Sequence, residues 1–284
     1  MTDRDQLEPN PERPDKPAVD LRTDRPHPAR VYDYLLGGKD NFAADRAAAE
    51  QGLKANGNSR VPPRENRAFL SRVVRYLTEE AGIRQFLDIG TGIPTAPNVH
   101  QVAQAIAPDS RIVYVDNDPI VLAHARALLT GTPEGRTEYL DADLRDVDRI
   151  LDSPQLRRTL DLDQPVGLLL IAIMHFVPDS DDPYALANRL LDALPSGSYL
   201  ALTHLTGDFA PEAWEAVAAI YRRTGVTMQV RPKPQIERFF DGLDLVEPGV
   251  RVLPDWRPDL GPAGTGERPS DVAVSVYGGV ARKR

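Results

Sequence analysis

A regular alternation of short apolar runs with helical stretches begins at Gln85, and it constrains this chain more than any other feature. Such alternation is typical of a parallel sheet whose two faces are covered by helices. The fourth run is the most apolar, so we expect it at the centre of the sheet. The five runs are Phe86–Ile89, Ile112–Val115, Thr137–Leu140, Val166–Ile173 and Tyr199–Thr203.

The last part of the chain departs from this alternation. Leu243–Val250 and Asp271–Val280 have the pattern of two strands, with no full helix between them. A loop rich in proline and glycine, from Pro254 to Pro269, connects them and predicts a late hairpin. The sequence therefore predicts an α/β fold with a mostly parallel sheet of seven strands.

Three helical segments are expected ahead of the first strand or leading into it. Residues 1–28 contain six prolines and many charges, so we expect a mobile tail that cannot bury enough apolar surface to fold. Apolar spacing predicts helices over Val31–Leu36, Ala43–Lys54 and Arg64–Ala81. The expected units are a tail (1–28), an N-terminal helical extension (29–63) and the main domain (64–284).

Composition excludes several classes of protein. The 284 residues include no cysteine, which excludes disulfide scaffolds, thiol catalysis and cysteine-bound metal. The net charge of −8 offers no bulk attraction to nucleic acid or to an anionic membrane. The longest apolar run, Leu168–Met174, is far shorter than the ~20 residues that span a bilayer. No apolar signal segment is visible, so we expect a cytoplasmic protein.

The segment Phe86-Leu-Asp-Ile-Gly-Thr-Gly-Ile-Pro-Thr95 places two glycines directly after the first strand. Gly90 and Gly92 let the backbone approach a ligand where a side chain would collide. A dinucleotide motif would carry a third glycine where Thr95 stands. The carboxylate of Asp88 would repel phosphates but suits a cationic amine. A tight turn without a ligand is the alternative interpretation.

The second strand ends in Asp116, followed by Asn117. An acid at this place can accept hydrogen bonds from both hydroxyls of a ribose. Asp116 lies 26 residues beyond Gly90, close to the spacing used for ribose recognition. Asn117 could contact the edge of an adenine. The alternative for Asp116 is a solvated strand end.

Acidic residues also follow the third strand. The carboxylate of Asp143 could accept from the amino group of adenine, while the amide of Leu144 donates to a ring nitrogen. Asp141 is a competing candidate for this role. On its own this segment is only an acidic loop.

The fourth strand runs into His175. Ligands bind at the carboxyl ends of the strands in open α/β sheets, so His175 is a candidate general base or substrate-orienting residue. A histidine that only caps backbone is the alternative. His100 and His124 fall in predicted helices and are expected at the surface. No histidine shows metal-ligand spacing, so no metal is expected.

Together these segments resemble class I S-adenosylmethionine-dependent methyltransferases. That family places an acidic-x-Gly-x-Gly turn after strand one, acids after strands two and three, and a reversed seventh strand at the end. The upstream segment Ala29-Arg-Val-Tyr-Asp-Tyr-Leu-Leu-Gly-Gly-Lys-Asp-Asn-Phe42 is similar to an actinobacterial group of S-adenosyl methyltransferase-like proteins, formerly a domain of unknown function. The resemblance implies a Rossmann-like sheet with a reversed last strand, and S-adenosylmethionine as the cofactor.

The resemblance also implies roles for single residues. Asp88 would face the methionine amine, Thr91 would pack with the two glycines against the cofactor, and Met174 would lie near the sulfonium. His175 would lie near the methyl acceptor. The family often has a third loop glycine, which this chain lacks. The expected cofactor-binding residues are Asp88, Gly90, Thr91, Gly92, Asp116, Asn117, Asp143, Leu144 and Met174.

Residues 29–63 are rich in aromatic residues, glycine and asparagine. We expect them either to cover the bound cofactor or to pack on the flank of the sheet. Tyr32, Tyr34, Asn41 and Phe42 are the candidate contacts of such a cover. Trp214 and Tyr221 have the seven-residue spacing of a core-facing stripe, which is favoured over a role in the acceptor pocket. His204, after the fifth strand, could line that pocket.

Methyl transfer from a sulfonium is an in-line displacement that needs alignment and desolvation, and a base only where the acceptor must lose a proton. The sequence therefore predicts methyl transfer to a small-molecule acceptor. A non-catalytic protein that binds S-adenosylmethionine or S-adenosylhomocysteine is one alternative. An NAD(P)-dependent oxidoreductase is the other, disfavoured by the missing glycine and by the acids at Asp88 and Asp143.

Overall fold

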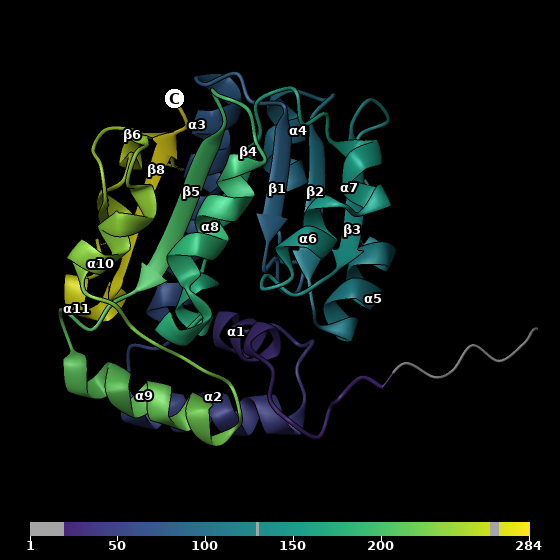
Figure 1. The fold of residues 1–284 in the computed structure, drawn as a ribbon. Helices are drawn as coiled ribbons and strands as arrows, with labels where there is room; N and C mark the ends of the chain where they lie inside the picture. Colours follow the sequence, from purple (N-terminus) through teal and green to yellow (C-terminus); the bar gives the residue numbers. More distant parts are fainter. Residues whose placement is uncertain (1–19, 129–130, 262–266) are drawn as a thin grey trace, which may run out of the picture.

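The computed structural model describes residues 20–128, 131–261 and 267–284 (Figure 1). Its described part contains one sheet of eight strands in the order β3-β2-β1-β4-β5-β8-β6, with β7 paired to β8 off this path. The first five strands are parallel, and β8 runs antiparallel to its neighbours. The strands are β1 Gln85–Ile89, β2 Arg111–Asp116, β3 Arg136–Asp141, β4 Gly167–Leu170, β5 Tyr199–Leu205, β6 Asp244–Leu245, β7 Arg251–Val252 and β8 Val276–Arg282.

Helices cover both faces of this sheet. In Figure 1, α6 and α8 lie in front of it, and α3 and α4 lie behind. Prolines open α8 and α9 at the first helical position, where the missing N–H leaves no bond unmade. The helices are α1 Pro28–Leu36, α2 Ala43–Ala55, α3 Val61–Glu79, α4 Val99–Ile106, α5 Pro119–Leu128, α6 Val147–Leu151, α7 Pro154–Thr159, α8 Pro183–Asp192, α9 Pro211–Arg223, α10 Lys233–Glu237 and α11 Asp271–Val274.

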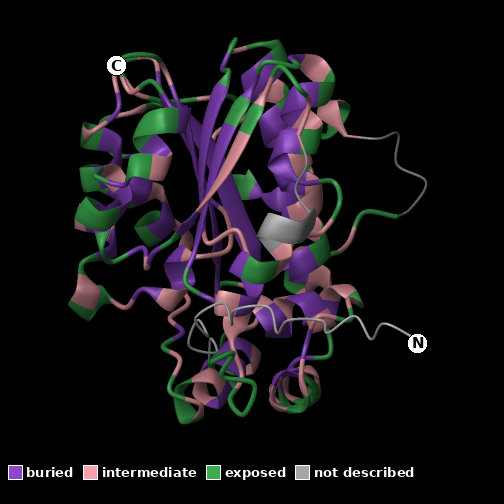
Figure 2. Cartoon of the chain, turned by 90° about the vertical axis from the view of Figure 1, so that its right-hand side faces the viewer, coloured by how far each residue is buried: buried purple, intermediate pink, exposed green. Residues whose placement is uncertain are grey.

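The core lies along both faces of the central strands. Every residue of β1, β4 and β5 is buried, which explains why these strands are apolar runs rather than alternating patterns (Figure 2). The Phe86 ring packs against Gly167 on the neighbouring strand, where an added Cβ would lie 2.9 Å from the ring. Because both faces of these strands are buried, the sheet holds the loops at its carboxyl ends in defined positions.

Three helices lie beyond the carboxyl ends of the parallel strands rather than on the faces of the sheet. These are α1, α2 and α9, at the bottom of Figure 1. Val31, Leu35 and Ala49 form a small apolar cluster of their own between α1 and α2. Tyr221 of α9 packs against this cluster and against the main core. Segments from opposite ends of the sequence therefore close one end of the molecule.

The predicted architecture is confirmed, with differences in its last strands. Only β6 lies within the expected strand Leu243–Val250, because the chain turns after it and the Gly249 amide donates to the Val246 carbonyl (2.8 Å). β7 begins just beyond the expected end, and this additional strand gives eight strands instead of seven. The expected strand Asp271–Val280 begins as α11, since Ser270 caps a helical turn by accepting from the Ala273 amide.

Two other boundaries differ from the prediction. β4 ends at Leu170 rather than at Ile173, because Ala172 adopts a left-handed conformation (φ 56°) that a strand cannot contain. α3 starts at Val61, since Pro62 and Pro63 are accommodated in its first turn. Most of the predicted tail, residues 1–19, lies outside the described residues. Over the ranges the structure describes, no helix has the length and apolarity that crossing a membrane requires.

Candidate functional site

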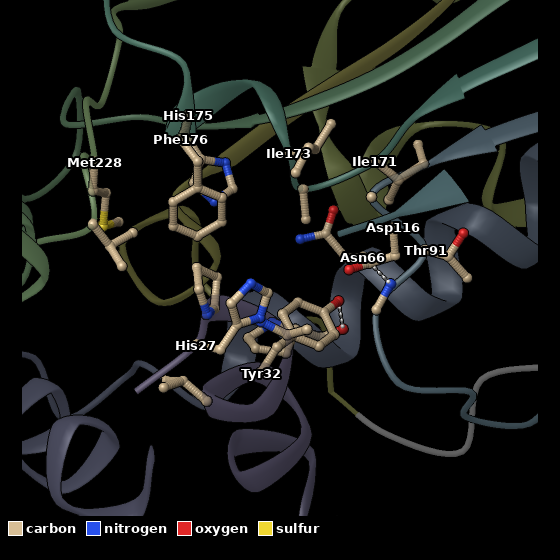
Figure 3. A pocket seen from close by; sticks show the side chains of 18 of the residues that line it. His27, Tyr32, Asn66, Thr91, Asp116, Ile171, Ile173, His175, Phe176 and Met228 are labelled. Carbon is tan, nitrogen blue, oxygen red and sulfur yellow. Dashed lines mark hydrogen bonds between the residues drawn. The ribbon is translucent and has the colours of Figure 1, made fainter. Parts of the chain in front are cut away.

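A cavity of about 420 Å³ lies at the carboxyl ends of the parallel strands. The turns after β1, β2, β3 and β4 line it on the sheet side, and α1, α3 and α9 line it elsewhere. Figure 3 shows His27 and Tyr32 on one side of it and Ile173, His175 and Phe176 on the other. Its volume falls within the roughly 300–1,000 Å³ typical of small-molecule sites.

The turn after β1 brings backbone to the cavity. Gly90, Thr91 and Gly92 all line it. Gly90 has a positive φ (77°), and an added Cβ would lie 2.7 Å from the side chain of Ile173. The Gly90 amide donates to the Val115 carbonyl (2.8 Å), which holds the turn against β2. Glycine is therefore required at this position by both conformation and space.

Asp88 contributes a buried carboxylate to the cavity lining, with 6% of the residue exposed. Burial raises the pKa of Asp88 to about 7, although the nearby charge of Arg67 opposes this shift. The negative charge of Asp116 adds to the rise. Because its charge is only partly compensated by the protein, this carboxylate is suited to a cationic ligand.

Asp116 lines the cavity at the end of β2, and two backbone amides orient its carboxylate. The Gly92 amide donates to Oδ2 (2.8 Å) and the Asp118 amide donates to Oδ1 (3.0 Å). Burial raises the pKa of Asp116, while these two hydrogen bonds lower it. The β1 and β2 turns are thus joined through one side chain.

Asn117, Asp143 and Leu144 also line the cavity. Asn117 donates from Nδ2 to Asp143 (2.8 Å), and the Arg145 amide donates to the same carboxylate (2.9 Å). Asp141, the competing candidate, is exposed and is absent from the lining. The structure therefore brings Asp143 rather than Asp141 to the cavity.

The two residues predicted after β4 are placed differently. His175 lines the cavity with 4% of the residue exposed, and its Nδ1 has no hydrogen-bond partner in the described part of the chain. Burial, followed by the influence of His204 and Arg231, lowers the pKa of His175 well below its ordinary value. Met174 is fully buried in the core and does not line the cavity, because the helical turn after Ile173 points it inward.

His204 is a structural partner rather than a lining residue. Its Nδ1 donates to the Leu205 carbonyl (2.7 Å), and its Nε2 accepts from the buried guanidinium of Arg231 (2.9 Å). Arg231 also donates to Asp179 (2.7 Å) and to the Val177 carbonyl (2.9 Å). This network fixes the segment after α9 against the loop that carries His175.

Residues of the N-terminal extension line the cavity. Of its four predicted contacts, only Tyr32 is in the lining, and its hydroxyl donates to the Pro63 carbonyl (3.0 Å). The others contact their own segment instead: Tyr34 pairs with Glu50, Asn41 with Asp33, and Phe42 lies under the guanidinium of Arg30.

A buried ion-pair cluster connects this extension to the sheet. Arg30 donates from Nε to Asp118 (2.9 Å), which follows β2, and lies 3.8 Å from Asp45 of α2. His27 contacts the same Asp118 oxygen through Nδ1 (2.9 Å). Sequence patterns did not predict this cluster, because Arg30 and Asp118 are 88 positions apart and no local spacing connects them.

Two further predictions need revision. Trp214 and Tyr221 are favoured as core residues by their spacing; Trp214 is buried and Tyr221 is half-buried against the core, and both also line the cavity. His100, expected at the surface, is buried, and the Tyr114 hydroxyl lies 2.8 Å from its Nδ1. Helical spacing alone could not show that Trp214 and Tyr221 line the cavity, or that His100 contacts Tyr114. Within the described ranges, no group of three or more potential ligands is placed to hold a metal ion.

A sheet of this order, with acids after its first three strands and a cavity at their carboxyl ends, defines a Rossmann-like S-adenosylmethionine-dependent methyltransferase. The chain belongs to the S-adenosyl methyltransferase family, whose model matches residues 14–284. S-adenosylmethionine is accordingly its cofactor.

Two solved structures are similar over nearly the whole chain. A DUF574 family protein from Streptomyces avermitilis is 49% identical, with a TM-score of 0.90, over 93% of this chain and 100% of that one. A candidate methyltransferase from Thermobifida fusca is 42% identical, with a TM-score of 0.83, over 93% of this chain and 97% of that one. No curated protein matches the sequence.

Proposed function

We propose that this protein transfers the methyl group of S-adenosylmethionine to a small-molecule acceptor inside the cavity. The observation that carries the proposal is the position of that cavity. It lies between the strand ends on one side and α1 and α9 on the other, so the cover faces the same space as the carboxylates. Residues 29–63 act as this cover. A macromolecular acceptor could not reach a reacting atom placed under it.

The residues around the cavity fit the cofactor. Asp88 is a buried carboxylate that an amine would pair with, and Asp116 is a hydrogen-bonded carboxylate suited to ribose hydroxyls. Gly90 and Gly92 leave room for the methionine and ribose beside Thr91. Asn117, Asp143 and Leu144 would hold the adenine. When bound, the cofactor supplies a methyl group activated by the positive charge of its sulfonium.

Two of the carboxylates in the lining make the same site unsuitable for a pyrophosphate. Asp88 and Asp143 would repel phosphate groups, and the turn lacks the third glycine that dinucleotide sites use. These features favour an adenosyl sulfonium over a nicotinamide dinucleotide.

His175 is the proposed catalytic residue. Its lowered pKa keeps the imidazole neutral at physiological pH, so that the ring can accept a proton from the acceptor or orient it. Arg231 and His204 hold the loop that carries it. Met174, which is enclosed in the core, has no proposed contact with the sulfonium other than through the backbone of its loop.

The direct test is a thermal-shift panel with S-adenosylmethionine, S-adenosylhomocysteine, NAD and NADP. We expect stabilisation by the two adenosyl ligands and none by the dinucleotides. Stabilisation by NAD or NADP alone would refute the proposal. A screen for methyl transfer to fractionated metabolites then separates an enzyme from a binding protein, since a protein that only binds would transfer no label to any fraction.

A further inference from the structure

Asn66 on α3 belongs to the cavity lining, although no sequence motif indicated it. Only 3% of the residue is exposed. In Figure 3 its amide projects into the cavity on the opposite side from His175 and Phe176, next to Ile173. Such a buried amide must satisfy both its oxygen and its nitrogen.

A chain of hydrogen bonds fixes which end of this amide faces the cavity. The Ala172 amide donates to Thr203 Oγ1 (2.8 Å), so the Thr203 hydroxyl must donate its own proton elsewhere. It donates to Asn66 Oδ1 (2.6 Å). The oxygen of Asn66 is therefore used within the protein. Nδ2 is left toward the cavity, without a partner in the part of the chain that is described.

The same series of hydrogen bonds includes a residue with an unusual backbone conformation. Ala172 has a left-handed conformation (φ 56°), which is unfavourable for a residue with a Cβ. Its neighbours Ile171 and Ile173 line the cavity on either side of it. The Thr203 hydroxyl thus holds both Ala172 and the side chain of Asn66, and both residues line the cavity.

The end of the cavity away from the strand-end carboxylates is mainly aromatic and apolar, and the Arg145 guanidinium next to Phe176 is already paired with Asp143 and Asp181. α9 contributes Trp214, Val217 and Tyr221, and the segment after it contributes Met228. The rings of Phe176 and Tyr221 are 5.8 Å apart and tilted by 50°. None of the lining residues from α9 or from 225–228 carries an ionised side chain. Aromatic rings of this kind bind flat, apolar molecules well, whereas they give a carboxylate or an ammonium group no ion-pair partner.

We infer that the acceptor is an uncharged aromatic molecule with a hydroxyl group, and that Asn66 is the positioning residue that donates from Nδ2 to its oxygen. The inference rests on the proposed function and specifies its substrate class. The ring would lie against the aromatic end of the cavity. Asn66 donates only one hydrogen bond, so it leaves a lone pair on the oxygen free to react.

The step balances without a further reagent. The hydroxyl oxygen forms the new bond to the methyl carbon, and the sulfur–carbon bond breaks with its electron pair going to sulfur. The hydroxyl lies between Asn66 and the neutral ring of His175 on the other side of the cavity, and its proton passes to that ring. A phenol suits this base better than an aliphatic alcohol because its proton is far more acidic.

The test uses 2-naphthol as a probe and 2-methylnaphthalene as its counterpart without a hydroxyl. Affinities are measured by titration calorimetry on the full chain saturated with S-adenosylhomocysteine. The wild type should bind 2-naphthol more tightly than 2-methylnaphthalene or 2-naphthoate. Asn66→Asp keeps an oxygen for Thr203 but replaces the donor, and should weaken 2-naphthol binding by about tenfold. Binding of 2-methylnaphthalene and of S-adenosylhomocysteine should not change.

Asn56→Asp is the matched control. Asn56 is also buried, with an unpartnered Nδ2 and an Oδ1 that accepts from the Asn58 amide (3.0 Å), but it does not line the cavity. This variant should bind 2-naphthol like the wild type. Equal wild-type affinity for the naphthol and its methyl counterpart, tighter binding of 2-naphthoate, or a loss confined to S-adenosylhomocysteine in Asn66→Asp would each overturn the inference. The wild-type affinities for 2-naphthol, 2-methylnaphthalene and 2-naphthoate test the inference even if Asn66→Asp does not fold. Failure of S-adenosylhomocysteine to bind the wild type would instead refute the proposed function.

Discussion

The two ends of the cavity are built in different ways. The carboxylate end comes from residues 86–144, where each acidic side chain lies at or just beyond the carboxyl end of a strand. The aromatic end combines α1, α9 and residues 225–228, which are distant in the sequence and meet only in the folded chain. The first end is charged and formed largely by backbone turns, whereas the second is apolar and formed by helix packing. Under the proposed function, recognition of the cofactor would depend on local geometry, and recognition of the acceptor would depend on how residues 29–63 and α9 pack together.

The largest expected effect concerns the docking of the cover. Arg30→Met removes the cation between Asp118 and Asp45, which are both fully buried. Leaving these carboxylates without their main partner should lower the free energy of unfolding by about 3–5 kcal/mol. Chemical denaturation measures this value.

Arg75→Ala is the control for this substitution, since its ion pair with Glu79 lies on the exposed face of α3. It should change the free energy of unfolding by about 0.5 kcal/mol or less. If Arg30→Met proved equally mild, the cover would not depend on the buried cluster.

The next effect tests the turn at the carboxylate end. Gly90→Ala combines a positive φ with an overlap against Ile173, and should lower the free energy of unfolding by about 2–4 kcal/mol. Gly92→Ala has a similar φ (68°) but no atom within 4 Å of the added Cβ. It should cost only about 1–2 kcal/mol. Equal destabilisation in thermal unfolding would show that Ile173 moves aside.

Cofactor affinity distinguishes the strand-end acids from their neighbours. Asp116→Ala should weaken S-adenosylmethionine binding by about 1–3 kcal/mol, because charge-assisted hydrogen bonds are lost. Asp141→Ala, at an exposed position outside the cavity, should leave the affinity unchanged. Calorimetric titration of both variants checks the assignment, and similar losses in the two would remove Asp116 from the site.

The smallest expected effect is a pH dependence of binding. A cationic amine pairs with ionised Asp88, whose pKa in the free protein is about 7. Below this pH the carboxyl group must first lose its proton, so affinity falls as pH falls. Between pH 8 and pH 6, binding of S-adenosylhomocysteine should weaken by about tenfold. In Asp88→Asn this decrease should disappear, and an unchanged pH profile would place the amine elsewhere.

The sequence predicted the carboxylate end well because strand ends are read from local patterns. Asp88, Asp116 and Asp143 all reach the cavity, since parallel strands deliver their last residues to one edge of the sheet. The prediction for Met174 failed after the irregular end of β4. Ala172 turns out of β4 with a positive φ, and the turn that follows buries Met174.

The aromatic end and the cover could not be predicted in the same way. Trp214 serves the core and the cavity together, and helical spacing cannot separate these two uses. The role proposed for Asn66 depends on its hydrogen bond with Thr203, 137 positions away. Arg30 gains its role from Asp118 in the same manner. Contacts of this range follow from tertiary packing, which no short pattern records.

The cluster around Arg30 connects the N-terminal helices to the sheet beside the cavity. Arg30 is buried together with the carboxylates of Asp45 and Asp118. Separating one of these groups from the others would leave a buried charge without a partner. We therefore expect the N-terminal helices to undock as one unit. Asp118 is two positions from Asp116, and its amide donates to that carboxylate. In the proposed function, release of S-adenosylhomocysteine and undocking of these helices would involve the same short loop.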